Sequence, residues 1–553
     1  MSSFGPSLRP GHSSQHNFAV VPDNTVARTS FNRTSRLVTT FDVDKLVPVF
    51  CDEILPGDTV NLEMLVQARL TTLAVPFLDN LYLDSFFFFV PNRLVWDSAE
   101  GSWQRFMGER TPDPDSSIDF TIPQIVSPVG GFLEQTLFDY LGWPTKVAGF
   151  SASTLPNRAY NLIWNEWFRD QNLQDSVVVD LDNGPDTVTD YVLLSRGKRH
   201  DYFTSCLPWP QKGDDVLLPL GTSAPIVLAD APNLGAKLTT AAAHSDATGT
   251  GYLQLNSGTL GAGFITQQNS TSTKYVIDPN GSLEADLSDA ASATINVMRE
   301  AVSLQQFLEL DARGGTRYIE IIRSHFNVVS PDARLQRPEY LGGGSSMIMV
   351  NPIAQTSASS EDGDLANLGA IGTVSARGRR EGHGCVRSFV EHGILMVLIA
   401  VRADLTYQQG CPRWLSRRTR YDFFWPTFQN LGEQAVLNKE IFAQGPAEVN
   451  PVTGVAYDEE AFGYQERFAE YRYFPNRITG KARSNADESL DNWHLSQDFA
   501  NLPQLNDEFI VSDTPIDRVT VVSTQPNFRG DFEFRLNHVR PMSMYSVPGL
   551  LRF

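Results

Sequence analysis

A cluster of arginines and aromatic residues near position 420 has the composition of a nucleic-acid contact. Cations and flat rings alternate along it, and its members are Arg413, Trp414, Arg417, Arg418, Arg420, Tyr421, Phe423, Phe424 and Trp425. Guanidinium groups neutralise phosphates, and each ring that stacks on an unpaired base contributes about 1–3 kcal/mol. The segment therefore predicts contact with single-stranded nucleic acid. The alternative is that the rings face a core and the arginines form ion pairs between subunits.

Two further groups of arginines are candidates for the same role. A smaller basic patch consists of Arg377, Arg379 and Arg380. The polar residues 1–40 contain a single acid and the four arginines Arg9, Arg28, Arg33 and Arg36. This composition predicts an extended basic arm, and the alternative is a frayed terminus.

Motifs for catalysis are absent from the sequence. It contains no phosphate-binding loop with the pattern GxxxxGK[ST], no GxGxxG, no GxSxG and no HExxH motif. The nine histidines do not cluster at the spacing of metal ligands, and the acidic run Asp458–Glu460 is typical of a solvated turn. We therefore expect a protein that is not an enzyme, with no catalytic, metal or cofactor site.

Charge and cysteine content narrow the remaining classes. The 553-residue chain carries a formal net charge of −20, so any contact with nucleic acid has to be made through local basic patches. The four cysteines, Cys51, Cys206, Cys385 and Cys411, lack the close spacing of metal or redox pairs. They predict free thiols.

Strand signals dominate both ends of the chain. Residues 36–96 alternate apolar and polar side chains between turns rich in proline and glycine, which is typical of a β-sandwich or barrel. The run Phe86–Phe89 predicts a strand that is buried on both faces or covered by another subunit. The apolar run Gly393–Val401 predicts a buried strand, because it is too short to cross a bilayer.

Two helices are expected between these strand regions. Residues 154–171 place Tyr160, Ile163 and Trp164 on one helical stripe. A second helix is expected to begin at a capping box formed by Ser303 and Gln306 and to continue to Phe326. Gly314 and Gly315 predict a break in its middle, since each glycine costs about 1 kcal/mol relative to alanine.

Residues 229–298 differ in composition from the rest of the chain. They hold few charges and few aromatic residues, namely Tyr252, Phe264 and Tyr275. Such a segment buries little apolar area alone, yet it lacks the charge of a typical disordered linker. We expect small β structure that packs against copies of itself, the alternative being a loose surface insertion.

The chain thus divides into six parts. They are an N-terminal arm (1–40), the first strands (41–96), loop and helix insertions with further strands (97–228), the surface insertion (229–298), a helix with loops (299–384), and the remaining strands with C-terminal segments (385–553).

Several long motifs resemble those of one viral family. DARGGTRYIEIIRSHF at 311–326 and SPDARLQRPEYLGG at 330–343 resemble stretches of the major capsid proteins of gokushoviruses, which belong to the Microviridae. Shorter matches are EHG at 391–393, YRYFPN at 471–476, WHL at 493–495 and HNF at 16–18, and residues 33–40 are also similar. The resemblance covers essentially the whole chain and is weakest at 229–298.

This resemblance implies a mainly β fold, an eight-stranded antiparallel jelly roll of the viral capsid type with large loop and helical insertions. It implies a T=1 icosahedral shell around a circular single-stranded DNA genome, with residues 229–298 forming a protrusion at the three-fold axes. The implied partners are further copies of the chain, an internal scaffolding protein, a small basic DNA-binding protein, a minor pilot protein and a host surface receptor. The chain would be part of the virion and would assemble in the host bacterial cytoplasm without membrane insertion.

A rival hypothesis from another class is a carbohydrate-binding or glycoside-cleaving β-sandwich protein. Jelly rolls host both activities, and Trp164, Trp167 and Trp414 could stack on sugars. That hypothesis requires an exposed aromatic cleft with two carboxylates at glycosidase separation.

Overall fold

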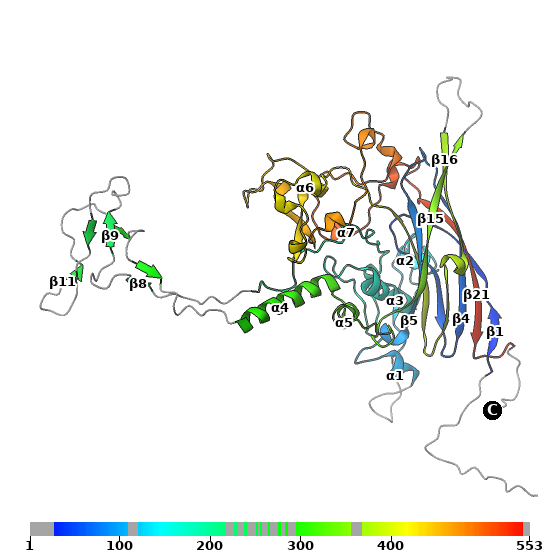
Figure 1. Cartoon of the computed structure of the whole chain (residues 1–553). Helices are drawn as coiled ribbons and strands as arrows, with labels where there is room; N and C mark the ends of the chain where they lie inside the picture. The colour runs from blue at the N-terminus through cyan, green and yellow to red at the C-terminus, as the bar shows by residue number, and fades with distance from the viewer. Residues whose placement is uncertain are drawn as a thin grey trace, which may run out of the picture. The chain divides into compact units, whose positions relative to one another are not determined.

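The computed structural model describes residues 27–108, 120–216, 295–354 and 368–545, together with the short strands between positions 226 and 285 (Figure 1). The chain forms two compact units. Unit 1 combines Met1–Pro210 with Gly314–Phe553, and unit 2 is Gln211–Arg313.

Unit 1 is built on a large antiparallel sheet whose strands come from both ends of the chain. They are β1 (Thr29–Asn32), β2 (Ser35–Phe41), β3 (Val47–Ile54), β4 (Thr59–Leu70), β5 (Leu81–Pro91), β15 (Glu339–Ala354), β16 (Leu368–Arg377), β17 (Gly384–Ser388), β18 (Gly393–Ala403) and β21 (Phe528–Arg540). β1 and β2 both pair with β21, and β16 and β17 both pair with β4. If β1 and β2 are counted as one strand, and β16 and β17 as another, the sheet has eight long strands.

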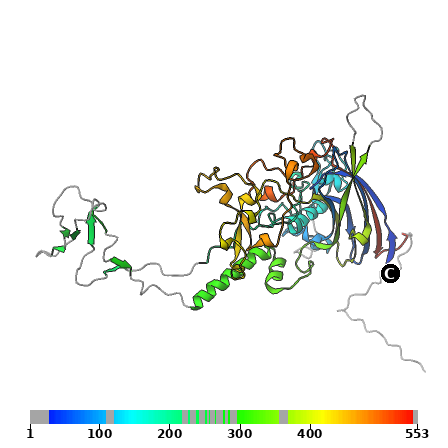
Figure 2. The ribbon, with the colours of Figure 1, turned by 45° about the horizontal axis from the view of Figure 1, so that its top comes forward.

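These eight strands have the connectivity of a jelly roll. One layer has the order β2–β21–β4–β16 and the other β3–β18–β5–β15. β15 joins the layers, because its first half pairs with β5 and its second half with β16. Figure 2 shows the sheet curling as a result. The predicted mainly β, antiparallel jelly roll is confirmed.

The first hydrophobic core fills the space between the two layers. Every second residue of β4 is buried, as expected for a strand with one face in a core. Rings from distant parts of the chain meet here, and Phe41 stacks on Phe528 with 5.3 Å between ring centroids. Phe87 and Phe89 of β5 point into the same core.

A second core covers the opposite face of β5 and β18. Phe88 and Met396 contribute to it from the sheet, and Tyr160 and Trp164 from the covering helix. All residues of β18 are consequently buried. The predictions of a Phe run buried on both faces and of a buried strand at 393–401 are confirmed.

The covering helix is α3 (Leu155–Ile163), which continues into a π-helical turn at Trp164–Phe168. Its position agrees with the helix predicted for residues 154–171. Arg158 is fully buried in it and forms an ion pair with Asp186, with 2.5 Å between Nη2 and Oδ1. The surrounding insertions carry α1 (Trp103–Met107), β6 (Gln124–Val126), α2 (Leu137–Tyr140) and β7 (Ser151–Ser153).

The second predicted helix is divided as expected but begins earlier. α4 (Ile295–Gly314) belongs to unit 2 up to Arg313, and α5 (Tyr318–Phe326) belongs to unit 1. Gly315 has a φ of +96°, which suits glycine and ends α4. The predicted start at Ser303 is wrong, because the residues before it include good helix formers such as Met298 and Ala301 and continue the helix through it.

The rest of unit 2 contains short antiparallel strands. β9 (Lys237–Thr240) pairs with β10 (Thr250–Tyr252) and β13 (Tyr275–Ile277), β11 (Leu255–Asn256) with β12 (Phe264–Ile265), and β14 (Leu283–Ala285) with β8 (Ile226–Leu228). The small β structure expected at 229–298 is present. Its association with other copies stays a prediction, and the side chains of Tyr252, Phe264 and Tyr275 lie outside the described part.

A third cluster of buried residues in unit 1 supports the C-terminal insertions. It gathers Tyr202 and Phe203 with Val436, Phe462 and Phe509. The elements that contribute are β19 (Glu433–Leu437), α6 (Asn438–Ile441), β20 (Ala461–Glu466) and α7 (Asp507–Ile510). The arginine and aromatic cluster described next borders this third core.

The four cysteines form no disulfide bonds, as their wide spacing in the sequence predicts. All four cysteines are free thiols, and burial raises the pKa of Cys51 and of Cys385 to about 12. None of the helices in the described residues has the length and apolar character needed to cross a bilayer.

Candidate nucleic-acid interface

The arginine and aromatic cluster lies where the chain leaves the jelly roll. After β18 ends at Ala403, the chain forms three short 3-10 turns, η5 (Arg413–Leu415), η6 (Arg420–Asp422) and η7 (Pro426–Phe428). We call residues 413–428 the ring segment. Proline at the start of η7 and the short turns favour an irregular surface path over a strand.

The rings of this segment point to solvent. Trp414, Tyr421, Phe423, Phe424 and Trp425 each expose between 43% and 54% of their surface. They are nevertheless held in place, since the backbone N–H of Phe424 donates to the hydroxyl of Tyr471 at 3.2 Å and Trp425 Nε1 donates to the carbonyl of Arg420 at 2.8 Å. These rings therefore do not belong to a core of their own chain.

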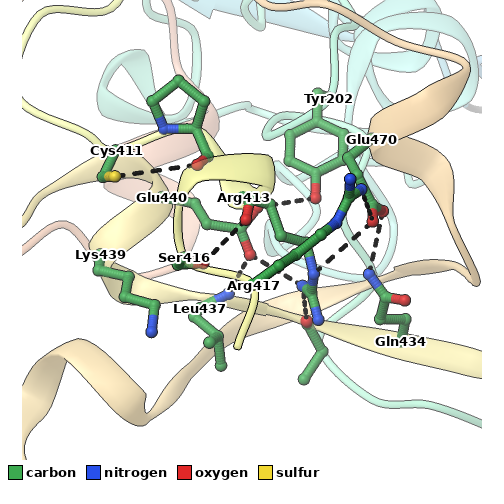
Figure 3. A network of polar contacts seen from close by, with 12 residues as sticks. Tyr202, Cys411, Arg413, Ser416, Arg417, Gln434, Leu437, Lys439, Glu440 and Glu470 are labelled. Carbon is green, nitrogen blue, oxygen red and sulfur yellow. Dashed lines mark hydrogen bonds and ion pairs between the residues drawn. The ribbon is translucent and has the colours of Figure 1, made fainter. Parts of the chain in front are cut away.

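Two arginines of the segment are held by carboxylates of the same chain (Figure 3). Arg413 Nη1 lies 2.9 Å from Glu440 Oε1 and also donates to the carbonyl of Ala435. Arg417 Nη2 lies 2.9 Å from Glu470 Oε1, and its guanidinium stacks over Tyr471. These ion pairs anchor the ring segment to the third core.

The carboxylates of this network are buried and fully used. Tyr202 donates its hydroxyl to Glu440 Oε2 at 3.0 Å, and Gln434 Nε2 donates to Glu470 Oε2 at 3.2 Å. Burial raises the pKa of Glu440, and the neighbouring Arg413 opposes that rise. A buried carboxylate that keeps its charge needs such partners. The network is thus a positioning device, and its two arginines are largely neutralised.

The remaining arginines of the segment are available to an external anion. Arg418 and Arg420 are exposed, and in the described part of the chain neither takes part in an ion pair. Arg420 lies over the ring of Tyr421 at 4.8 Å. A cation beside exposed rings is the arrangement that binds a phosphate next to a stacked base.

The second basic patch lies on the jelly roll. Arg379 is in a 3-10 turn, Gly378–Glu381, where it contacts Asn61 at 3.2 Å and Glu63 at 4.0 Å. Arg380 is exposed. Arg377 ends β16 opposite Leu65 of β4, and its side chain lies outside the described part.

The arginines of the predicted arm mostly bind the sheet. Residues 29–32 and 35–41 are strands β1 and β2, so this part of the predicted arm is integrated into the jelly roll. Arg28 donates to the carbonyl of Gly57, Arg33 pairs with Asp52, and Arg36 pairs with Asp531. Arg9 lies outside the described residues.

A second group of exposed rings was not predicted from the sequence. Tyr471, Tyr473 and Phe474 expose about half or more of their surfaces, and Phe474 lies under the guanidinium of Arg477 at 5.4 Å. The signal was present in the sequence, because residues 471–477 read YRYFPNR and interleave rings with arginines as the ring segment does. This group borders a pocket that also touches Trp414.

The tryptophans that favoured a carbohydrate-binding protein are mostly not exposed. Trp164 is 6% exposed in the second core, and Trp167 packs against the same core while its Nε1 donates to the carbonyl of Pro338. Of the three, Trp414 is the exposed one. Within the described residues there is also no group of three or more side chains that could hold a metal ion.

An eight-stranded jelly roll with large insertions and an exposed ring surface defines a class that includes viral capsid and lectin domains. Sequence comparison distinguishes between these. Residues 19–550 match a family described as "Capsid protein (F protein)", and the chain belongs to this family of phage capsid proteins. Capsid proteins assemble with copies of themselves and are part of the virion, so the role is structural.

Relatives with curated descriptions agree along nearly their whole length. The chain is 48% identical to Capsid protein VP1 of Bdellovibrio phage phiMH2K over 97% of both chains. It is 42% identical to Capsid protein VP1 of Chlamydia phage 1 and 36% identical to that of Spiroplasma virus 4, each over 97% of this chain and 98% of the relative. The resemblance to Microviridae capsid proteins is confirmed.

Proposed function

We propose that this chain is the major capsid protein of a T=1 icosahedral shell that encloses a circular single-stranded DNA genome. The observation that carries this proposal is the match to phage capsid proteins along nearly the whole chain. Weak contacts repeated with closed symmetry give a stable shell, so no single interface needs to be strong.

The ring segment faces the genome in this proposal. Its rings are half exposed while its ion pairs fix it to the third core, so stacking on unpaired bases costs little ordering entropy. Arg418 and Arg420 then neutralise phosphates, and Arg379 and Arg380 supply a second, smaller contact. The alternative occupant of the same rings is a neighbouring subunit.

Other proteins complete the virion in this proposal. A chain with a formal net charge of −20 neutralises little of a genome by itself, so a small basic DNA-binding protein supplies the remaining positive charge. An internal scaffolding protein directs assembly in the host bacterial cytoplasm, and a minor pilot protein is incorporated. The insertion at 229–298 forms three-fold protrusions and contributes to attachment to a host surface receptor.

A reconstruction of purified particles by cryo-electron microscopy tests the shell. We expect one copy of the chain per asymmetric unit, with the ring segment on the inner surface. If the chain stays monomeric in the presence of its partner proteins, the proposed shell is wrong. If the ring segment lies on the outer surface, the proposed contact with the genome is wrong.

Deletion of residues 229–298 tests the role of the insertion. We expect the shortened chain to fold, because the strands of the jelly roll lie outside this segment, and the particles to lose host attachment. A shortened chain that does not fold would show that the insertion is part of the core structure.

A further inference from the structure

A pocket of about 190 Å³ opens beside the ring segment, between η5 and residues 473–479. Its walls are aromatic and its rim carries cations, and the residues that matter here are Trp414, Tyr473, Phe474, Arg477 and Arg483. Tyr407 and Phe203 of the third core form part of its base. The ion-pair network of Figure 3 borders it through Arg413, Glu440 and Glu470.

The volume of the pocket limits its occupant to one small flat ring system. An apolar cavity of about 150 Å³ holds a single benzene molecule. Pockets for larger small molecules start at about 300 Å³. At about 190 Å³ the pocket is therefore matched to one small flat ring system, either a single ring or two fused rings, and an oligosaccharide chain does not fit it.

The charges around the pocket favour a ring that carries an anion. Glu440 and Glu470 are already paired with Arg413 and Arg417. Arg477 is exposed at the rim and Arg483 is half-buried, and in the described part of the chain no ion pair involves either. The rim therefore has an excess of positive charge beside an aromatic wall.

Three polar side chains of the lining are already engaged by the protein itself. The hydroxyl of Tyr407 donates to Asp201 Oδ2 at 2.6 Å. The side-chain amide of Gln408 donates to Ser484 Oγ, and that of Asn476 donates to the carbonyl of Leu405. These three side chains are not free to read the edge of a base, so an occupant would be bound mainly by its faces.

We propose that this pocket takes one unpaired nucleobase of single-stranded DNA, whose flanking phosphate is bound by Arg477 and Arg483. The base stacks on the rings of Trp414, Tyr473 or Phe474, and the site accepts any of the four bases. This inference rests on the proposed function, because it requires the genome to reach this face of the subunit.

Binding of a single-stranded oligodeoxynucleotide that contains 2-aminopurine tests the proposal on the purified, unassembled chain. We expect fluorescence quenching as the base stacks, and no quenching with the corresponding duplex. Phe474→Ala should weaken binding by about 5- to 150-fold, the range expected for one lost stack. Phe474 is 70% exposed, so its replacement should leave the thermal unfolding of the chain unchanged.

A charge variant and a matched control complete the experiment. Arg477→Gln should lower the slope of log affinity against log salt concentration by about 0.7, as for one lost phosphate contact on a single strand. Phe326 of α5 lies outside the pocket and is similarly exposed, at 73%. Its replacement by alanine should change neither the affinity for the oligonucleotide nor the dependence of that affinity on salt.

The possible results separate this inference from the proposed function. If Phe423→Ala weakens oligonucleotide binding but Phe474→Ala and Arg477→Gln do not, the genome contact stands and the base pocket is wrong. If a peptide with an aromatic side chain displaces the probe while free nucleotides do not, the occupant is a protein and the proposal is overturned. A failure of the unmodified chain to form shells contradicts the proposed function, whatever the pocket binds.

Discussion

Strand β18 and the ring segment are close in sequence and rich in apolar residues, yet they have opposite environments. β18 lies between β3 and β5 with a core on each face, and all of its residues are buried. The ring segment begins ten residues after β18 ends and exposes about half of five of its rings, from Trp414 to Trp425. The apolar surface of β18 is buried within the subunit, whereas that of the ring segment stays exposed and can contact another molecule.

The charges explain how a chain keeps rings exposed in one orientation. β18 contains one charged residue, Arg402 near its end, which pairs with Asp84. In the ring segment arginines alternate with the rings, and Arg413 and Arg417 reach buried carboxylates. Polar anchors therefore fix the segment, and the rings remain free to contact a partner.

The largest effect on stability is expected in β18. Leu395→Ala should lower the free energy of unfolding by about 2–5 kcal/mol, because Leu395 is fully buried in the first core and its loss leaves a cavity. Guanidinium unfolding of the unassembled chain measures this change. Val386→Ala in β17, where the side chain is half exposed, is the control and should change it by less than about 0.5 kcal/mol.

Much of this sheet could be predicted from the sequence, because its signals are local. Phe86–Phe89 and residues 393–401 are continuous apolar runs, and such runs indicate strands buried on both faces. The glycine pair at 314–315 likewise marks the end of α4. The strand signal of residues 36–41 is local as well, but the pairing of β2 with β21 was not predicted, since the two strands lie about 500 residues apart, as in the pairing of Ser35 with Phe534.

The candidate interface could be predicted in composition but not in geometry. Alternating arginines and rings fit an exposed platform and a buried edge equally well. The difference depends on Glu440 and Glu470, which are 27 and 53 residues from the arginines that they bind. No local pattern indicates such pairings, and these two contacts decide which arginines stay available.

The second largest effect is expected in the network that anchors the ring segment. Glu470→Gln should lower the free energy of unfolding by about 2–3 kcal/mol, because it leaves the nearly buried Arg417 without its counter-charge. Glu488→Gln is a control, since the Lys481–Glu488 pair is exposed and contributes little. An equal effect of the two replacements would show that the network does not anchor the segment.

Lys198 is buried and forms no ion pair within the described residues, so its loss of a proton should make the stability of the fold depend on pH. Burial lowers the pKa of Lys198 to about 8, although Asp201 opposes this shift. Between pH 8 and 10.5 the unfolded chain holds this proton and the folded chain does not, so Lys198 makes folding more favourable as pH rises. The gain is roughly 2 kcal/mol by pH 10.

A comparison with Lys198→Met isolates this contribution. The thiols of Cys51 and Cys385 titrate in the opposite sense, because their folded-state pKa is raised and rising pH favours the unfolded chain. Both proteins share these thiols, so the difference between their unfolding free energies reports Lys198 alone. A difference that stays constant from pH 7 to 10 would mean that Lys198 is solvated.

The smallest effect on stability is expected for the exposed rings, and it is the most direct test of the contrast with β18. Phe423→Ala should change the free energy of unfolding by less than about 1 kcal/mol, because half of the ring is already in water. The same replacement should reduce the DNA content of assembled particles, measured as the ratio of absorbance at 260 and 280 nm. Loss of stability as large as that of Leu395→Ala would place the ring in a core. If stability is kept but no particles form, the ring belongs to a contact between subunits, since a side chain that does not stabilise its own subunit then acts only once a second copy covers it.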